Sequence, residues 1–459
     1  MASTYLSRTP ASAGNRKTFT ISAWIKRGLL ANSSTFETII SAIYNTGSGY
    51  GDFIRFIDND TLDIIYFDGV VSYRLTTNRK FRDVNAWYHI VIAFDTTQAT
   101  DSDRIKVYVN GTQETSFATA TYPNLNRDTQ YNNTVVQNIG FRNTIGEYFS
   151  GSMAHVHLID GTAYDADTFG ETDATTGIWK PITAPSVTYG TNGVFLKFEN
   201  SGAFGTDSSG NSNNFTVNGT MTQTIDTPSN VFATFNPLTI PSSSGLTLSD
   251  GNLSLSGSST DAGAKATLGV SSGKWYWEVK ANVASSGSDR HLVATDIVRQ
   301  ITSATDPNSQ GIWGIQSRSG SGATLNSYTN GTFSNVNTGS TGYDDNTIIS
   351  VALDMDNGKL YFAKNGTWTD LAGNVGDPVA GTNPTFTGLP TDGTIILPYV
   401  ENRQAGTPSS QINFGNGYFG TTQVSSAENP DDGIGIFEYA VPTGYKALCT
   451  KSINAQEYD

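Results

Sequence analysis

The chain has little of what would place it in several common protein classes. Cys449 is its only cysteine, so no internal disulfide can form. The sequence contains no run of 18 apolar residues, and residues 1–16 have no apolar core. These absences exclude a membrane-spanning helix and lead us to expect a chain that carries no secretion signal.

Positive charge is also scarce. The 459 residues include 27 Lys and Arg against 41 Asp and Glu, which gives a net charge of −14. Binding to a phosphate backbone needs clustered Lys and Arg to displace counterions. We therefore expect neither nucleic acid as a partner nor insertion into a membrane.

No long stretch has apolar residues at helical spacing. Charged residues make up only 15% of the chain, whereas glycine, at 47 residues, is abundant alongside Ser, Thr and Asn. This composition is typical of many short strands joined by tight turns. The sequence therefore predicts an all-β protein.

Two segments share one layout: a strand ending in Asp, a polar turn, a second strand, and then Asn-Gly-Thr. They run from Trp87 to Thr112 and from Ile348 to Thr367. Because side chains alternate along a strand, each hairpin has one apolar face that a second sheet must cover. A chain of this length suits two domains of about 200 residues, so we expect two tandem antiparallel β-sandwiches. The apolar faces consist of Ile90, Ile92, Phe94, Ile105, Val107 and Val109, and of Ile349, Val351, Leu353, Leu360 and Phe362, while Lys359, Tyr361 and Lys364 are expected outward or at strand ends.

The first half resembles a known fold family. FTISAWIKR (19–27), the WYHIVIAFD hairpin with VYVNGT (87–112) and YFSGSMAHVHLIDG (148–161) occur in the order typical of the laminin-G-like, concanavalin A-type lectin sandwich. The resemblance covers residues 3–220. In that family a strand and a D-x-S-G-N turn open the domain, whereas here VFLKF (194–198) and the turn Asp207–Asn211 close it. We expect residues 194–217 to fold back beside the first strand.

The second half resembles the SPRY family over residues 246–420. The matching segments are SSGKWYWEVK (271–280), GIWGIQ (311–316), the hairpin at 348–368 and ILPYVENRQAGTPSSQINFGNGYFG (396–420). A long ordered set of segments at 154–182, 189–200, 205–219 and 226–238 is similar to virion structural proteins of tailed bacteriophages, especially marine ones. This resemblance implies a virion location.

The domain boundaries follow from composition. We place a concanavalin-like sandwich at 1–222, a Pro- and Ser-containing linker at 223–245, a SPRY-like sandwich at 246–447 and a tail at 448–459. Phe232, Phe235 and Leu238 make the linker apolar enough to pack on a domain. The last segment, around Tyr445 and Cys449, could form an apolar strap on the second domain or on a neighbouring subunit. Long loops at 296–310, 319–342 and 371–387 are candidates for recognition.

Catalysis is not expected. Glycoside hydrolysis needs two carboxylates facing one groove, which a strand supplies as E-x-D-x-x-E. The only E-x-D pairs are at Glu171 and Glu457, and neither continues the motif. No histidine lies in a nucleophile pattern such as G-x-S-x-G. His155 and His157 share a strand face, but two ligands are too few for zinc, so packing is the favoured role.

Two sets of residues are candidates for binding. Sugars stack on aromatic rings and hydrogen-bond to polar side chains, and five tyrosines lie in or beside turn-rich segments. The turn after residue 206 offers oxygen ligands for Ca²⁺, and calcium at a sandwich rim in some laminin-G-like modules adds to this hypothesis, although Asx-turn hydrogen bonding is favoured. The ligand-binding candidates are Tyr44, Tyr50, Tyr122, Tyr131 and Tyr328, and the metal candidates are Asp207, Ser209, Asn211 and Asn214.

The expected function is that of a non-enzymatic virion surface protein, in a tail fibre, a spike or a head fibre, assembled in the host cytoplasm. Its loops would bind a bacterial surface glycan or neighbouring virion proteins, and a symmetric homo-oligomer, a trimer, is expected. Two alternatives remain: a purely structural decoration or tail component, and a polysaccharide depolymerase.

Overall fold

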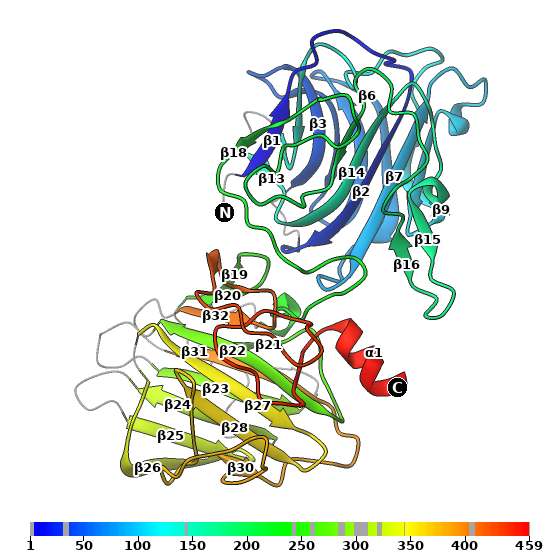
Figure 1. Cartoon of the computed structure of the whole chain (residues 1–459). Coiled ribbons are helices and arrows are strands. Elements are labelled where there is room, and N and C mark those ends of the chain that lie inside the picture. The colour runs from blue at the N-terminus through cyan, green and yellow to red at the C-terminus, as the bar shows by residue number, and fades with distance from the viewer. Residues whose placement is uncertain are drawn as a thin grey trace. The chain divides into compact units, whose positions relative to one another are not determined.

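The computed structural model describes residues 4–30, 36–142, 146–240, 245–257, 262–282, 290–297, 311–318, 324–343, 345–403 and 409–458. The chain divides into two compact units, residues 1–223 with 227–229, and residues 224–226 with 230–459. Each unit consists of two packed β-sheets (Figure 1). The prediction of an all-β fold with two sandwiches is confirmed.

The first unit places a sheet of eight described strands against a sheet of six. In the larger sheet the order is β10 (Phe117–Thr121), β6 (Val71–Lys80), β5 (Thr61–Phe67), β4 (Tyr50–Phe56), β3 (Glu37–Asn45), β11 (Val136–Ile139), β1 (Tyr5–Arg8) and β18 (Thr216–Asn218). In the smaller sheet it is β17 (Val194–Leu196), β14 (Gly151–Asp160), β2 (Thr18–Arg27), β7 (Trp87–Asp95), β8 (Ile105–Val109) and β9 (Thr112–Glu114). A 3₁₀ turn, η1 (Asp101–Asp103), joins β7 to β8.

Strand β18 pairs antiparallel with β1, with Leu6 opposite Val217. The expected return of the segment after residue 194 to the first strand is therefore confirmed. The sequence shows this return only through the resemblance, because a three-residue strand carries no periodicity of its own.

The two predicted hairpins form with the predicted apolar faces. In β7–β8, Ile92 lies opposite Val107, and both side chains are buried in the first core. In the second unit, Val351 of β27 (Thr347–Asp354) lies opposite Phe362 of β28 (Lys359–Lys364) in the second core.

The Asn-Gly pair after each hairpin closes it in the same way. Asn110 and Gly111 both have positive φ, at 48° and 80°, as do Asn365 and Gly366, at 46° and 80°. Each Asn side-chain oxygen accepts a backbone N–H from the strand opposite, His89 at 2.7 Å and Ile348 at 2.9 Å. The pairs are therefore type I′-like reversals, which explains why both hairpins end on the same residues.

A covering segment, residues 161–193, lies on the outer face of the six-stranded sheet. It contains η2 (Ala166–Thr168) and a small sheet of β15 (Gly170–Thr172) and β16 (Trp179–Pro181). Its apolar side chains bury Val91 and Ile159 of the sheet. A second small sheet, β12 (Phe141–Arg142) with β13 (Glu147–Tyr148), lies beside β3.

The second unit has the same two-layer plan. Its larger sheet contains β19 (Thr247–Ser249), β20 (Ser254–Ser256), β32 (Ser409–Asn413), β22 (Lys274–Asn282), β27, β28 and β29 (Thr367–Thr369), with β30 (Phe386–Thr387) on β28 and β35 (Lys446–Ala447) parallel to β22. The smaller sheet is β21 (Ala262–Lys265), β31 (Ile396–Arg403), β23 (Arg290–Ile297), β24 (Ile312–Arg318), β25 (Thr324–Thr329) and β26 (Thr332–Thr341). The remaining described elements are η3 (Pro237–Thr239), β33 (Tyr418–Phe419) with β34 (Thr422–Gln423), and α1 (Thr450–Tyr458).

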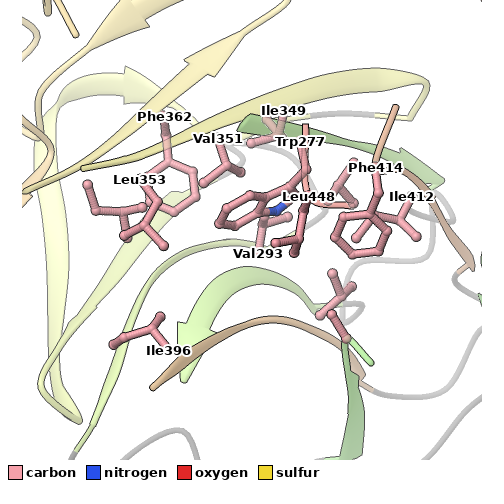
Figure 2. Close-up of a cluster of buried hydrophobic side chains, with 14 of the residues drawn as sticks. Trp277, Val293, Ile349, Val351, Leu353, Phe362, Ile396, Ile412, Phe414 and Leu448 are labelled. Carbon is pink, nitrogen blue, oxygen red and sulfur yellow. The ribbon is translucent and has the colours of Figure 1, made fainter. Parts of the chain in front are cut away.

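The core of the second unit forms between these sheets. Figure 2 shows Trp277 of β22 among apolar side chains of both sheets, including Val293 of β23, Val351 of β27 and Ile396 of β31. Leu448, from the last segment of the chain, lies in the same cluster. The C-terminal segment is thus part of the core of the second unit.

The outer face of the larger sheet is covered as well, which corrects one expectation. Tyr361 is only 1% exposed and packs with Tyr276 and Ala352 of the sheet against Phe437 and Tyr445. Tyr361 therefore does not point into solvent. The reason is that the last segment lies over this face as a second apolar layer.

The predicted linker is shorter than 223–245. Phe232 bridges to Cys449 and Phe235 to Ala266, and both rings are buried in the second unit. Leu238 is 65% exposed. Residues 230–240 therefore belong to the second unit, and the tail after residue 447 belongs to it too.

The predicted recognition loops divide into three outcomes. Residues 298–310 and 319–323 lie outside the described residues. Residues 324–341 form the β25–β26 hairpin and are not a loop. Residues 370–385 do form a loop, in which Asp370 and Asp377 accept backbone N–H groups as Asx turns.

Within the described residues, no helix is long and apolar enough to span a membrane.

Candidate functional site

Two neighbouring turns at one end of the eight-stranded sheet lie beside a group of aromatic and polar residues that are partly exposed. The turns join β3 to β4 and β5 to β6, and both lie at the same end because these strands are consecutive and antiparallel. We call this group the tyrosine rim. It consists of the exposed Tyr44 and Asp68, the half-buried Tyr50 and Arg127, and the buried Tyr66, with the exposed Val70 and Val71 beside it.

The local sequence explains the shape of the first turn. The Asn45 side-chain oxygen accepts the backbone N–H groups of Gly47 and Ser48, an Asx turn. The pairing register shifts between Ile43 and Asn45, so Tyr44 is the extra residue of a β-bulge. The bulge turns the Tyr44 ring toward solvent, where it is 42% exposed.

The rings of the rim brace one another. The Tyr44 and Tyr50 ring centroids are 6.5 Å apart, and the planes are inclined by 47°. Tyr50 contacts Phe67 edge-on at 5.5 Å. Burial, Asp68 and Tyr44 all raise the pKa of Tyr66, so its hydroxyl remains protonated. The arrangement presents two inclined aromatic faces beside a carboxylate.

A buried arginine holds the first turn from beneath. Arg142 donates to the Gly49 carbonyl oxygen from Nε at 3.1 Å and from Nη2 at 2.9 Å. Its guanidinium lies 3.8 Å from the Phe53 ring centroid and pairs with Glu147 at 3.3 Å. The Gly49 carbonyl is thus fixed before any ligand arrives, which lowers the ordering cost of binding.

Ion pairs continue this support across the outer face of the sheet. Glu147 also pairs with Arg55 at 3.1 Å, Arg55 with Asp63 at 3.3 Å, and Asp63 with Arg74 at 2.7 Å. Alternating charges on four elements therefore connect β6 with the β12–β13 hairpin. Each arginine in this series forms an ion pair with an acidic side chain of the protein.

Arg127 is the exception. Its guanidinium lies 4.1 Å from the Tyr66 ring centroid and 5.7 Å from that of Tyr73. The side chain is half-buried, and its Nε atom is buried without a hydrogen-bond partner. The charge of Arg127 acts on Asp52, whose carboxylate oxygens accept the Tyr73 hydroxyl and the Gln130 N–H. Arg127 is stacked in place but lacks an acceptor on this buried nitrogen.

The five predicted tyrosines divide into three groups. Tyr44 and Tyr50 meet at the rim. Tyr122 is half-buried and packs on the first core. Tyr131 and Tyr328 are 3% and 2% exposed, which corrects their assignment as ligand contacts, since a ring inside the core cannot stack on a sugar. Turn-rich sequence predicts proximity to the surface, not the direction of the ring.

The predicted calcium turn uses its oxygens internally. The Asp207 carboxylate accepts the backbone N–H groups of Phe195, Ser209 and Asn213 and the Ser209 hydroxyl. Asn214 accepts the Asp207 N–H, while the Asn211 amide donates to backbone carbonyls. Donors that converge on a carboxylate repel a cation, so these residues do not fit calcium and form the favoured Asx turn.

Three histidines gather under the covering segment. His89 lies between Ser22 Oγ, at 2.9 Å from its Nε2, and the Trp179 indole, which donates to its Nδ1. The His157 ring stacks on the Phe195 ring, with the ring centroids 4.0 Å apart. His155 lies at a bulge with a φ of 46°, and its ring centroid is 6.3 Å from that of His157. Burial lowers the pKa of all three. They are neutral packing groups, and no set of three or more His, Cys, Asp or Glu in the described part of the chain could hold a metal ion.

Glu171 and Asp173, the described carboxylates whose sequence pattern is most similar to a hydrolase motif, form ion pairs within the protein. Glu171 and Asp173 both pair with Lys180, at 3.5 and 2.9 Å. Hydrogen bonds from Thr176 and Lys180 lower the pKa of Asp173, which is the opposite of what a general acid needs.

Sequence reasoning missed Tyr66, Asp68 and Arg127. The Asp68-Gly69 dipeptide is a turn signal beside a tyrosine and could have placed Asp68 near the surface. Arg127 carries no such signal, because its stacking on Tyr66 joins residues 61 positions apart.

Two family models match the chain, one in each sandwich. Residues 2–167 match the concanavalin A-like lectin/glucanases superfamily (Laminin_G_3), and residues 274–401 match the SPRY domain. No curated protein matches the chain. The solved PSpry domain of TRIM65 is 16% identical, with 39% of this chain and 91% of that chain covered at a TM-score of 0.28. The SPRY domain of human HERC1 is 15% identical, with 39% and 96% covered, also at 0.28.

Proposed function

We propose that this chain, a concanavalin A-like domain followed by a SPRY domain, is a non-enzymatic virion surface protein of a tailed phage that binds a glycan on the host surface. The tyrosine rim carries the proposal. Stacking aromatic faces, an exposed carboxylate and a turn held rigid from beneath are the features that sugar recognition uses. Binding requires no change to a covalent bond of the ligand.

Support for the virion setting comes from the sequence. The ordered segments from residue 154 to residue 238 are similar to structural proteins of tailed phages. The acidic charge and the many short turns suit a protein at a particle surface, where it must not adhere to nucleic acid. The proposed location is a tail fibre, a spike or a head fibre.

A purely structural role is the second candidate. Val375 and Val379, 75% and 55% exposed on the loop between β29 and β30, favour it, because exposed apolar side chains on a fixed loop suit a protein neighbour. In that case the rim too would contact a virion subunit, and no glycan would bind.

The test is binding of the purified chain to an array of bacterial surface glycans and to host cells. We expect saturable binding that the double variant Tyr44→Ala, Tyr50→Ala weakens at least tenfold. Ile178→Ala is the matched control, because Ile178 is 44% exposed in the same unit but lies in the covering segment. Absence of binding to any glycan or host cell would favour the structural role, and release of reducing ends from a bound polysaccharide would establish a depolymerase.

A further inference from the structure

We propose that Arg127 is the carboxylate-binding group of the tyrosine rim and that the ligand is an acidic sugar, a pyranose ring bearing a carboxylate. The inference deepens the proposed function and rests on it. It assigns a binding role to a residue that packing alone does not explain.

The first argument is the missing acceptor. Arg27, Arg55, Arg74 and Arg142 each pair with a protein carboxylate. Arg127 shares with them a partly or fully buried position, but its buried Nε has no hydrogen-bond partner. An external carboxylate cannot reach the enclosed Nε. No described protein group accepts a hydrogen bond from the terminal Nη1 and Nη2 groups either, so a ligand carboxylate could bind these two groups by two parallel N–H···O bonds.

The second argument is the fixed orientation of the guanidinium. Stacking at 4.1 Å on Tyr66 and 5.7 Å from Tyr73 holds its plane against the rings. Its own backbone is fixed as well, since the Arg127 N–H donates to Asn124 and the Arg127 carbonyl accepts the Thr96 hydroxyl. A planar cation held in this way loses little freedom on binding a planar carboxylate.

The third argument is the arrangement of groups around it. The Tyr66 hydroxyl, beyond the ring that Arg127 covers, interacts with both Asp68 and Tyr44. The ring of a sugar could therefore lie on Tyr44 and Tyr50 with its hydroxyl groups donating to Asp68, while its carboxylate reaches Arg127. Within the tyrosine rim, the exposed carboxylate of Asp68 and the guanidinium of Arg127 match a ligand with both hydroxyl groups and one negative charge.

Asp52 interacts with Arg127 through its charge but accepts no hydrogen bond from it. Asp52 is fully buried, and burial raises the pKa of its carboxyl group to about 6 despite hydrogen bonds from Tyr73 and Gln130 and the charges of Arg127 and Arg16. Its two oxygens are already occupied by those two donors. Arg127 therefore retains its N–H groups for an external anion.

The experiment compares each of three acidic oligosaccharides, containing a uronate, a sialate or a ketodeoxyoctonate, with the same compound after reduction of its carboxyl group. Binding is measured for the full chain and for Arg127→Gln and Arg127→Lys by calorimetry at two salt concentrations. We expect at least one acidic compound to bind the wild type at least tenfold more tightly than its reduced form. Arg127→Gln should abolish that preference and its salt dependence, with the reduced form bound as before, and Arg127→Lys should restore only part of it.

Control variants separate the outcomes. Tyr44→Ala should weaken the binding of the acidic and the reduced compounds alike, and Ile178→Ala should change the binding of neither. If a reduced compound binds as tightly as its acidic parent, or if Arg127→Gln leaves the preference intact, the role of Arg127 is wrong while glycan binding stands. If neither form of any compound binds, on this panel or on the glycan array, the proposed function itself fails. Unfolding curves confirm that each variant is folded.

Discussion

The indole N–H of Trp179 donates to Nδ1 of His89 at 3.0 Å. This bond fixes the tautomer of His89, because Nδ1 must then be the acceptor and Nε2 carries the proton toward Ser22. The indole occupies a slot that two glycines leave open, since a Cβ at Gly111 or Gly170 would lie 2.8 or 2.5 Å from its ring. The bond attaches the covering segment to the sheet.

Trp179→Phe should therefore loosen the covering segment. The buried Nδ1 of His89 loses its donor, which costs about 1–3 kcal/mol, and part of the slot between the glycines empties. Native-state hydrogen exchange of the full chain should show faster exchange across residues 161–193. Ile178→Ala, an exposed neighbour, should stay within about 0.5 kcal/mol of wild type. Equal exchange in the two variants would mean that the bond does not hold the segment.

The pKa of His157 lies well below its usual value because burial disfavours the imidazolium form. Below pH 6.5 the imidazole of the unfolded chain takes up a proton, whereas the buried imidazole of the folded chain stays neutral. The free energy of unfolding therefore falls as pH falls below 6.5. His157→Phe should remove this loss, making the variant relatively more stable at pH 5 than at pH 7 by about 2 kcal/mol.

The histidine measurement is a difference in unfolding free energy between wild type and variant at each pH, from urea denaturation. The difference is needed because burial raises the pKa of Glu37 to about 7 and that of Asp52 to about 6, and both act in the opposite direction. A difference that does not change with pH would contradict the burial of a neutral imidazole.

Glu278 gives the second unit a pH dependence of opposite sign. Burial raises the pKa of its carboxyl to about 7, although the Tyr276 hydroxyl and the Glu438 and Tyr439 N–H groups donate to it. A raised carboxyl pKa gives stability that is complete below about pH 4.5 and lost as pH rises through 7. Between pH 5 and 8 this amounts to roughly 2 kcal/mol.

Glu278→Gln should lower stability at every pH, because an amide offers one oxygen to donors that use two, but it should flatten the decline toward pH 8. The comparison uses urea unfolding of both proteins from pH 5 to 8. Parallel curves would show that Glu278 is ionised throughout the range.

The sandwich pair could be predicted because its signals are local. Alternation in β7 and β27 and the Asn-Gly pairs at residues 110 and 365 specify hairpins within about 25 residues of sequence. The second layer on each unit could not be predicted from local sequence. Strand alternation predicts that Tyr361 points outward, because Phe437 and Tyr445, which cover it, come much later in the sequence. The linker was overestimated for the same reason, because Phe232 pairs with Cys449.

The site was predictable only in part. Tyr44 and Tyr50 flank one turn, so a turn signal finds them together. Tyr131 has equally polar neighbours in sequence, yet it points into the core, where its ring contacts Phe19 and Phe94. Arg127 joins the rim through a contact between segments far apart in sequence, which no periodicity encodes.

The most direct test of the account is ¹⁹F NMR of the full chain labelled with 3-fluorotyrosine and titrated with oligosaccharide from the host surface. Tyr44→Phe and Tyr50→Phe, and the same change at Tyr131 and Tyr328, assign the four resonances. We predict that the Tyr44 and Tyr50 resonances shift with the ligand, that those of the buried Tyr131 and Tyr328 do not, and that the recovered oligosaccharide is unchanged in length. Unshifted rim resonances under a ligand that binds elsewhere, or a shortened oligosaccharide, would contradict the account.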